Sequence, residues 1–212
     1  MPLAVDRVVL AREYAANCYL VRADEGSQEL AVIDPGGDPA PLLAKLDRLG
    51  LTVGGILVTH ADVDHIGGVA ELAAGTGAGV WVPAGEADQL RTGRTRGFLT
   101  VAPHDPEHEV QDGDTVPVAG ISFEVVGIPG HSADHVAFCA DHSIFGGDLL
   151  FAGSVGRVDL EGGDWETLLA SVARLLERFG PDAIVYPGHG EPTTLGRELA
   201  SNPFLGELRA AH

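Results

Sequence analysis

The chain has 212 residues, 45% of them hydrophobic, which is enough to close a sizeable core within one domain spanning residues 1–212. Its 31 Asp and Glu residues outnumber 13 Lys and Arg residues, so the formal charge of −18 disfavours binding to nucleic acid or to an anionic membrane surface. Only two cysteines, no basic leader and no apolar run long enough for a membrane span predict a cytoplasmic protein.

The first half of the chain predicts short strands separated by two helices. Strands are expected at about residues 8–10, 19–22, 30–33, 54–58 and 80–83. The first helix is expected to be capped by Asp38, to carry leucines on one face and to end at Gly50. A second helix is expected at about 68–74. Residues 91–113 show little periodicity and are predicted to form a loop.

The second half repeats this pattern with one long helix. Strands are expected at about residues 115–118, 122–127, 136–140, 143–145 and 183–186. Asp164 is the expected cap of an amphipathic helix at 165–179, and a short helix is expected at about 195–200. Strand runs interrupted by helices predict an α/β (α+β) fold of two facing sheets with helices outside, although an ordinary α/β sheet also fits the spacing.

Histidine and aspartate side chains recur just after predicted strands, among glycines. These residues are His60, Asp62, Asp64, His65, His131, His135, Asp148 and His189. Loops at strand ends bring side chains from distant parts of a sequence together, and imidazole with carboxylate is a ligand set for zinc, iron or manganese. Four candidate ligands between His60 and His65 cannot all be buried unpaired without a large desolvation cost. The sequence therefore predicts a divalent metal site, the alternative for this segment alone being a solvated acidic turn.

The segment His60-x-Asp62-x-Asp64-His65 resembles the H-x-H-x-D-H signature of the metallo-β-lactamase-fold hydrolases. Gly130-His131, Gly147-Asp148 and Gly188-His189 fall where that family keeps its later ligands. Three further stretches, 151–159, 186–190 and 193–204, are similar to the single-domain glyoxalase II group, the hydroxyacylglutathione hydrolases. The resemblance spans nearly the whole chain and implies a four-layer αββα sandwich with metals in a groove at one edge of the two sheets.

The resemblance also implies two divalent metal ions, with zinc as the first candidate. One ion would be held by His60, Asp62, His131 and Asp148, and the other by Asp64, His65 and His189, with Asp148 bridging the pair. The implied reaction is hydrolysis of a small-molecule thioester, an S-hydroxyacyl thiol. Metal-bound hydroxide would be the nucleophile, with Asp64 and Asp148 as the catalytic carboxylates.

Arg157 lies in a stretch that is near the site in the resembling enzymes. It is expected either to bind a substrate carboxylate or to form a buried ion pair with a nearby acid such as Asp159. The additional helical domain of the larger glyoxalase II enzymes is expected to be absent, because fewer than twenty residues follow Thr193. The thiol carrier therefore stays open among glutathione, another low-molecular-weight thiol and coenzyme A, and the oligomeric state is equally open.

Asp62 departs from the family signature, which has histidine at this position. An anionic oxygen ligand makes the site less positive and favours harder ions, so iron or manganese becomes a candidate. His60, His131 and Asp148 alone form a two-histidine, one-carboxylate triad, and the alternative function is a mononuclear non-haem iron persulfide dioxygenase of the same superfamily. Nuclease-like competence domains also carry a carboxylate here, but the net charge argues against that function. The last alternative is a metal-binding protein with a degenerate site.

The remaining candidates are given structural roles. His135 is expected to support the ligands without binding metal. Isolated histidines without supporting neighbours are expected to be solvated or packed, namely His104, His108, His142 and His212. Residues that fit the family's architecture and are interpreted as structural are Tyr19, Thr193, Arg197 and Asn202.

Overall fold

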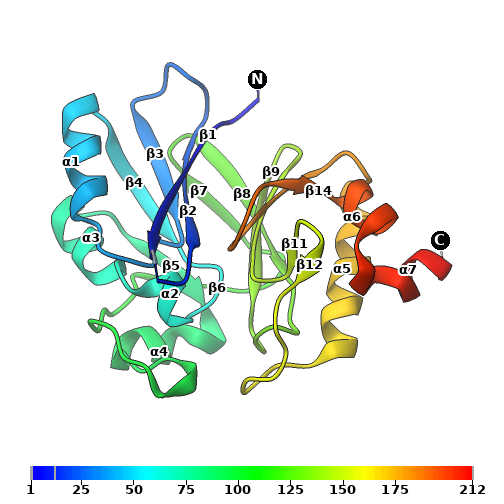
Figure 1. The fold of residues 1–212 in the computed structure, drawn as a ribbon. Helices are drawn as coiled ribbons and strands as arrows, with labels where there is room; N and C mark the ends of the chain where they lie inside the picture. The colour runs from blue at the N-terminus through cyan, green and yellow to red at the C-terminus, as the bar shows by residue number, and fades with distance from the viewer. Residues whose placement is uncertain (1, 12, 212) are drawn as a thin grey trace.

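Two six-stranded sheets face each other in the computed structural model, which describes residues 2–11 and 13–211 (Figure 1). The first sheet has the order β1 (Ala4–Ala11), β2 (Ala16–Arg22), β3 (Glu29–Ile33), β4 (Thr52–Leu57), β5 (Val80–Pro83) and β6 (His108–Val110). The second has the order β14 (Thr193–Thr194), β13 (Ile184–Pro187), β10 (Ser143–Gly147), β9 (Val136–Ala140), β8 (Ile121–Gly127) and β7 (Thr115–Val118). A small separate ladder joins β11 (Leu150–Phe151) to β12 (Ser154–Val155). Neighbours from β3 to β6 are parallel, as are β10 and β13, whereas the other neighbouring pairs are antiparallel.

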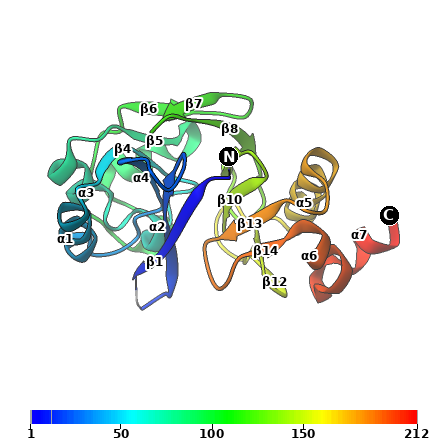
Figure 2. The same ribbon diagram turned by 90° about the horizontal axis from the view of Figure 1, so that it is seen from above.

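Helices cover the outer face of each sheet (Figure 2). Helices α1 (Ala40–Leu49) and α3 (Val69–Thr76) lie on the first sheet, and α5 (Trp165–Phe179) and α6 (Leu195–Ser201) lie on the second. The shorter helices are α2 (Val63–Ile66), α4 (Ala87–Thr92) and α7 (Gly206–Ala211), with 3-10 turns η1 (Ala84–Glu86), η2 (Arg96–Phe98) and η3 (Pro203–Leu205). The predicted four-layer αββα sandwich is confirmed. Within the described part of the chain, no helix combines the length and apolarity needed to cross a membrane.

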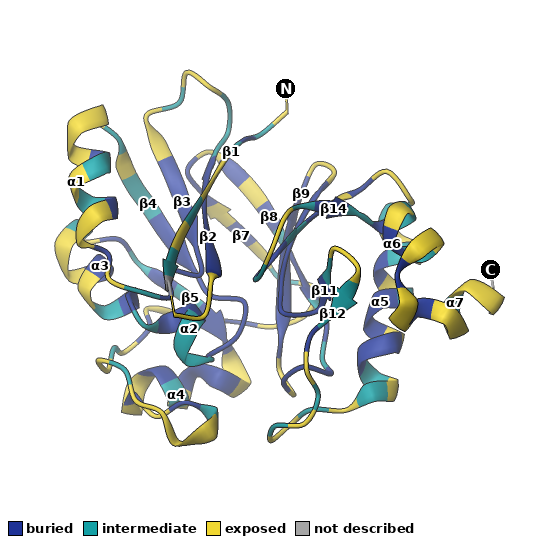
Figure 3. Ribbon diagram, in the orientation of Figure 1, coloured by how far each residue is buried: buried dark blue, intermediate teal, exposed yellow. Residues whose placement is uncertain are grey.

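Side-chain alternation along the central strands builds the layers. In β2, Cys18 and Leu20 pack with the leucines of α1, whereas Tyr19 and Val21 belong to the core between the sheets. Because successive side chains of a strand point to opposite faces, a single buried strand contributes to two cores. Figure 3 shows the result, with buried strands between helices whose outer faces are exposed.

The helix and strand predictions are largely confirmed, and the differences have local causes. Helix α5 covers the predicted residues, and the side chain of Asp164 accepts a hydrogen bond from Thr167 N as its cap. Helix α1 begins at Ala40 with Pro39 as its cap residue, although Asp38 Oδ1 does accept a hydrogen bond of 2.9 Å from Ala40 N. The prediction of a loop over 91–113 is wrong in part, because β6 in this segment pairs in parallel with β5.

The loops that follow β4, β8, β10 and β13 meet at one edge of the sandwich. Backbone hydrogen bonds join them to neighbouring elements: Val136 N donates to Thr59 O at 3.0 Å, and Gly188 N donates to Gly147 O at 2.7 Å. Asn17 N in β2 donates to Gly188 O at 2.7 Å, which connects the first sheet to the second. The residues at the carboxyl ends of these strands are thereby held close together.

Gly130 sets the distance between this edge and α5, which gives a first prediction. Its φ is +129°, and a Cβ added there would lie 2.4 Å from the backbone Cα of Leu168. Gly130→Ala is therefore expected to reduce the free energy of unfolding by about 3 kcal/mol in urea denaturation. Gly50→Ala is the matched control, since Gly50 has φ +66° and no atom within 4 Å of its added Cβ, and should cost about 1 kcal/mol. Equal losses of unfolding free energy in the two variants would contradict the close contact between Gly130 and α5.

Candidate metal centre

Seven polar side chains converge at the edge where the four loops meet. The segment from His60 to His65 follows β4 and enters α2, while His131, Asp148 and His189 follow β8, β10 and β13. Three overlapping groups have donor atoms within 4.8 Å of one another: His60, His65 and Asp148; His60, Asp62 and His131; and Asp64, His65 and His189. The structure thus brings together every residue that the sequence predicted as a metal ligand.

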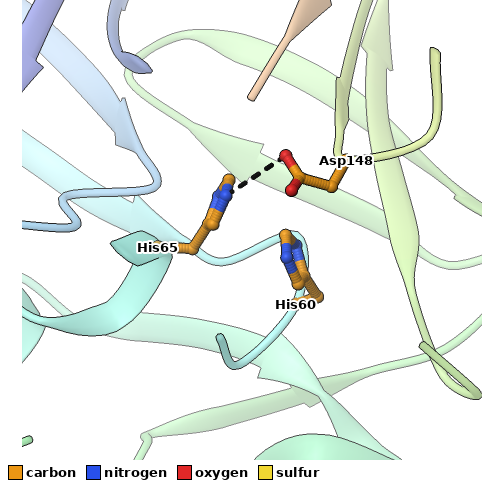
Figure 4. A group of neighbouring side chains, drawn as sticks. All are labelled: His60, His65 and Asp148. Atoms are coloured by element: carbon orange, nitrogen blue, oxygen red, sulfur yellow. Dashed lines mark ion pairs between the residues drawn. The ribbon is translucent and has the colours of Figure 1, made fainter. Parts of the chain in front are cut away.

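Asp148 lies between the histidines of the centre. Its Oδ1 is 3.3 Å from His65 Nε2, as Figure 4 shows, and its Oδ2 is 3.3 Å from His189 Nε2. His189 Nε2 is also 3.3 Å from Asp64 Oδ2, and His131 Nε2 is 3.8 Å from Asp148 Oδ2. A carboxylate in this position could bridge two cations.

Three histidines are oriented by a hydrogen bond at their outer ring nitrogen. The partners of Nδ1 are Thr59 Oγ1 for His60 at 3.0 Å, Asp34 Oδ2 for His65 at 3.0 Å and the Arg157 carbonyl for His131 at 2.8 Å. A hydrogen bond at one ring nitrogen fixes the ring and leaves the other nitrogen for a metal. All three Nε2 atoms therefore face the centre.

The Nε2 atom of His60 shows whether the residues present fit a metal. The residue is 0% exposed, and within the described part of the chain this nitrogen has no hydrogen-bond partner. A buried polar atom without a partner costs free energy, and a cation among these carboxylates would satisfy it. Imidazole nitrogens and carboxylate oxygens are suitable donors for zinc, iron or manganese, so the residues present fit a divalent metal.

Burial and the neighbouring carboxylates shift the pKa values of three histidines of the centre. Burial by itself would lower the pKa of His65, but the carboxylates of Asp148 and Asp34 outweigh it and raise that pKa well above its usual range. Burial is also outweighed at His189, where hydrogen bonds with Asp148 and Asp64 raise the pKa to about 10. His60 behaves oppositely, because burial lowers its pKa. A metal ion that binds here must displace protons.

Asp62 is paired with Arg96, a residue of the segment predicted to be a loop. Arg96 Nε donates to Asp62 Oδ1 at 2.7 Å, and Nη2 donates to Oδ2. Burial would raise the pKa of Asp62, but its contacts with His131 and with the guanidinium outweigh burial and hold the pKa well below its usual range. No local sequence pattern marks Arg96, because the segment around it lacks periodicity and its partner is 34 residues away.

Two buried carboxylates that sequence reasoning missed support the ligand loops. Glu86, 4% exposed, accepts hydrogen bonds from the backbone N of Ala61 and from Ser132 Oγ, so it ties the loop after β4 to the loop after β8. Asp34 has φ +53° and accepts hydrogen bonds from Thr59 N at 2.8 Å and Thr59 Oγ1 at 2.7 Å, besides its contact with His65.

The other candidates lie around the centre. Arg157 forms two hydrogen bonds of 2.7 Å with Asp159, but the pair is exposed, so the prediction of a buried ion pair is wrong in its burial, and the role of Arg157 in substrate binding stays a prediction. The His135 ring lies 4.6 Å from that of His60 and outside the three ligand groups of the described residues, and its supporting role stays a prediction. His104, His108 and His142 also lie outside these groups, and His212 is outside the described residues. Structural hydrogen bonds are made by Tyr19 to Pro187 O, Thr193 to Glu198 and Asn202 to Ser154 O.

Two hollows adjoin the centre. One, of about 320 Å³, lies directly over it, and its walls include Leu99, Leu160 and Arg157. The other is larger, about 720 Å³, and is lined mainly by β1, the turn after β3 and the residues near Thr100. Tyr14 and Val63 line both hollows, so the two adjoin.

The sequence profile of the Metallo-beta-lactamase superfamily matches residues 11–189. The chain belongs to this superfamily. It is 32% identical over 207 residues to hydroxyacylglutathione hydrolase GloC of Haemophilus influenzae, a match that covers 93% of this chain and 96% of the relative. The resemblance to the glyoxalase II group is thus confirmed, and the superfamily supports a metal-dependent hydrolase in general.

Solved structures agree with this assignment. BLEG-1 B3 metallo-beta-lactamase superposes with a TM-score of 0.87 at 32% identity, covering 96% of this chain and all of that one. TTHA1623 in a di-iron-bound form gives a TM-score of 0.79 at 40% identity, covering 95% of this chain and all of that one. ETHE1 from Myxococcus xanthus gives 0.77 at 27% identity, covering 96% of this chain and 85% of that one.

The contact of Asp34 with His65 gives a second prediction. Asp34→Asn keeps the size of the side chain and tolerates the positive φ, but its amide group cannot stabilise the His65 ring in the same way. Zinc affinity, measured by competition with a chromophoric chelator, should fall by about 10- to 100-fold. The same change at Asp141, which has φ +50° in the exposed turn between β9 and β10, is the control and should leave zinc affinity unchanged. An equal loss in both variants would refute the role of Asp34.

The raised pKa values of His65 and His189 give a third prediction, for the pH dependence of metal binding. Below a pKa of about 10 His189 carries a proton that competes with the metal, and raising the pH removes this competitor. Manganese affinity should therefore keep rising above pH 7, by about tenfold per pH unit for each proton displaced. Calorimetry between pH 6.5 and 8.5 in buffers of different ionisation enthalpy measures both affinity and proton release. Histidines of ordinary pKa would instead give an affinity that levels off above pH 7.

Proposed function

We propose that this protein is a thioester hydrolase of the glyoxalase II type, which uses divalent metal to cleave an S-hydroxyacyl thiol. The observation that carries the proposal is the convergence of His60, His65, His131 and His189 with three aspartates at one sheet edge. Support for the substrate class comes from the likeness to hydroxyacylglutathione hydrolase GloC over nearly the whole chain. Zinc is the first candidate, with iron or manganese as alternatives because of Asp62.

The residues would hold two ions. His60, Asp62, His131 and Asp148 would hold one; Asp64, His65 and His189 would hold the other, with Asp148 between them. Such ions polarise a scissile carbonyl and lower the pKa of water. Within the protein, Asp34 keeps His65 directed at the centre, and Glu86 keeps the loops of His60 and His131 together.

The two hollows suit the two ends of a thioester. The 320 Å³ hollow over the centre would take the hydroxyacyl group, and the walls formed by Leu99 and Leu160 would limit access of bulk water. The adjoining 720 Å³ hollow would take the thiol carrier, and the thioester sulfur would lie near Tyr14, which lines both. Arg157 at the rim would bind a substrate carboxylate after leaving Asp159.

One specific observation favours a second candidate, a persulfide dioxygenase with one iron. His60, His131 and Asp148 form the two-histidine, one-carboxylate set that leaves positions open on non-haem iron. The likeness to ETHE1 from Myxococcus xanthus accompanies this observation. Oxygen chemistry would need only one ion and an oxygen supply, so the two functions are separable by experiment.

The fourth prediction tests the function directly. Protein purified without added metal should hydrolyse S-lactoylglutathione, followed as loss of thioester absorbance, and a panel with coenzyme A and other thiol esters identifies the carrier. Asp148→Asn should lower kcat/KM by at least about 100-fold, because Asp148 contacts His65 and His189 at the middle of the centre. Asp141→Asn is the matched control and should retain activity.

Oxygen uptake with glutathione persulfide is measured in parallel on the same protein. Thioester cleavage without oxygen uptake supports the hydrolase. Oxygen uptake with one iron per chain and no thioester cleavage supports the dioxygenase instead. A chain that retains no metal and shows neither activity supports a degenerate site and refutes both enzymatic functions.

A further inference from the structure

All the hydrogen-bond donors of the Arg96 side chain have partners within the protein. Its Nε donates to Asp62 Oδ1 at 2.7 Å, and Nη1 donates to the carbonyls of His131 at 2.6 Å and Glu161 at 3.1 Å. Its Nη2 donates to Asp62 Oδ2 and lies 2.9 Å from His131 Nε2. A guanidinium has five N–H groups, and all five have partners here. The side chain of Arg96 is only 7% exposed, so its position is fixed.

The contact between Arg96 and His131 involves the atom that a metal would need. The Arg157 carbonyl accepts a hydrogen bond from His131 Nδ1 at 2.8 Å, so a neutral ring carries its lone pair at Nε2. Arg96 Nη2 lies 2.9 Å from this nitrogen and donates to it in the neutral ring, whereas in a protonated ring Nε2 would donate to Asp62 Oδ2, which is 3.1 Å away. One lone pair cannot serve a guanidinium and a cation at once, so a metal at His131 must break this hydrogen bond.

The same competition applies to Asp62. Both of its oxygens accept from the guanidinium in the two-point geometry that is strongest for arginine and carboxylate. Asp62 and Arg96 together carry no net charge, as a neutral histidine at position 62 would. The pair, however, places a fixed positive group where a cation would approach His60, Asp62 and His131.

The other half of the centre has no such competitor. Within the described part of the chain, no hydrogen bond or ion pair joins Asp64, His65 or His189 to a lysine or arginine. A cation that enters this half meets no fixed positive side chain, whereas a cation that enters the other half must displace a guanidinium whose five N–H groups all have partners. A cation must therefore break more contacts within the protein to bind in the half of His60, Asp62 and His131 than in the half of Asp64, His65 and His189.

We propose that Arg96 makes the two halves of the metal centre unequal in their affinity for a divalent cation. The half formed by Asp64, His65 and His189 binds the first divalent cation, whereas the half formed by His60, Asp62 and His131 accepts a second only after Arg96 withdraws. Arg96 is thus a determinant of metal stoichiometry. This inference rests on the proposal that the centre holds divalent ions, and it is independent of whether a thioester is cleaved.

The fifth prediction tests this inference with Zn²⁺ on the metal-stripped full chain, by equilibrium dialysis and elemental analysis at pH 7.5. The wild-type chain should bind one ion tightly and a second at least about tenfold more weakly, because entry of the second breaks charge-assisted hydrogen bonds. Arg96→Gln should tighten the second ion by at least about tenfold and change the first by less than about threefold.

The chain offers a matched control at Arg157. It lines the same hollow and has the same charge, but its guanidinium is paired with Asp159 and bonds to no candidate ligand. Arg157→Gln should leave both dissociation constants within about twofold of the wild-type values, whereas a purely electrostatic effect of charge at the rim would tighten the second ion in both variants. That outcome overturns the inference.

A second set of variants removes the other half. His189→Ala should abolish tight binding of the first ion, and the double variant Arg96→Gln/His189→Ala should regain one ion at the half of His60 and His131. Should Arg96→Gln fail to fold, Arg96→Lys keeps the charge without the two-point contact and should tighten the second ion as well. Equal affinities for two ions in the wild-type chain would overturn the inference, as would a second ion unaffected by both Arg96 variants.

These outcomes are separate from the fate of the proposed function. Two ions of unequal affinity in a chain that does not cleave thioesters would support this inference and reject the hydrolase. Two ions of equal affinity in a chain that cleaves thioesters would reject the inference and support the hydrolase.

Discussion

Several carboxylates can be buried at one sheet edge only if positive charge is buried with them. Asp62, Asp64 and Asp148 lie close together in a chain that already carries a formal charge of −18. A guanidinium supplies balancing charge on one side of the centre, and on the other the carboxylates raise the pKa of His65 and His189, which favours protonated rings. The chemistry of the edge follows from this balance, because a divalent cation is the group that can replace mobile protons there.

Buried residues around this edge hold the charged side chains of the centre in position. Glu86 joins two ligand loops through one side chain, and Asp34 joins the end of β3 to Thr59 and His65. Both carboxylates are buried and accept hydrogen bonds from groups that are themselves next to candidate ligands. Displacement of either loop would break bonds to buried acceptors, which is costly. The ligand positions are therefore maintained by the fold before any metal enters.

Sequence reasoning recovered the features that are encoded locally. Helix α5 was predicted over its full length because its cap and apolar face occur within 16 consecutive residues, and the candidate ligands were found because they follow strands among glycines. Arg96 and Glu86 were missed because what defines them is a contact across space: Glu86 meets Ser132 from 46 positions away, and no periodic pattern marks either residue. Strands β11, β12 and β14, with two residues each, are too short for a pattern to register.

The ligands are divided between the two sheets, since His60 to His65 follow a strand of the first and His131 to His189 follow strands of the second. Neither half of the chain can assemble the centre by itself, so a divalent cation at this centre would bind the native state and not the unfolded ensemble. By mass action, free metal at about 100 times its dissociation constant would add about 2.7 kcal/mol to the apparent stability. The fraction of chains that are folded at a given temperature is thus coupled to the metal supply of the surrounding medium.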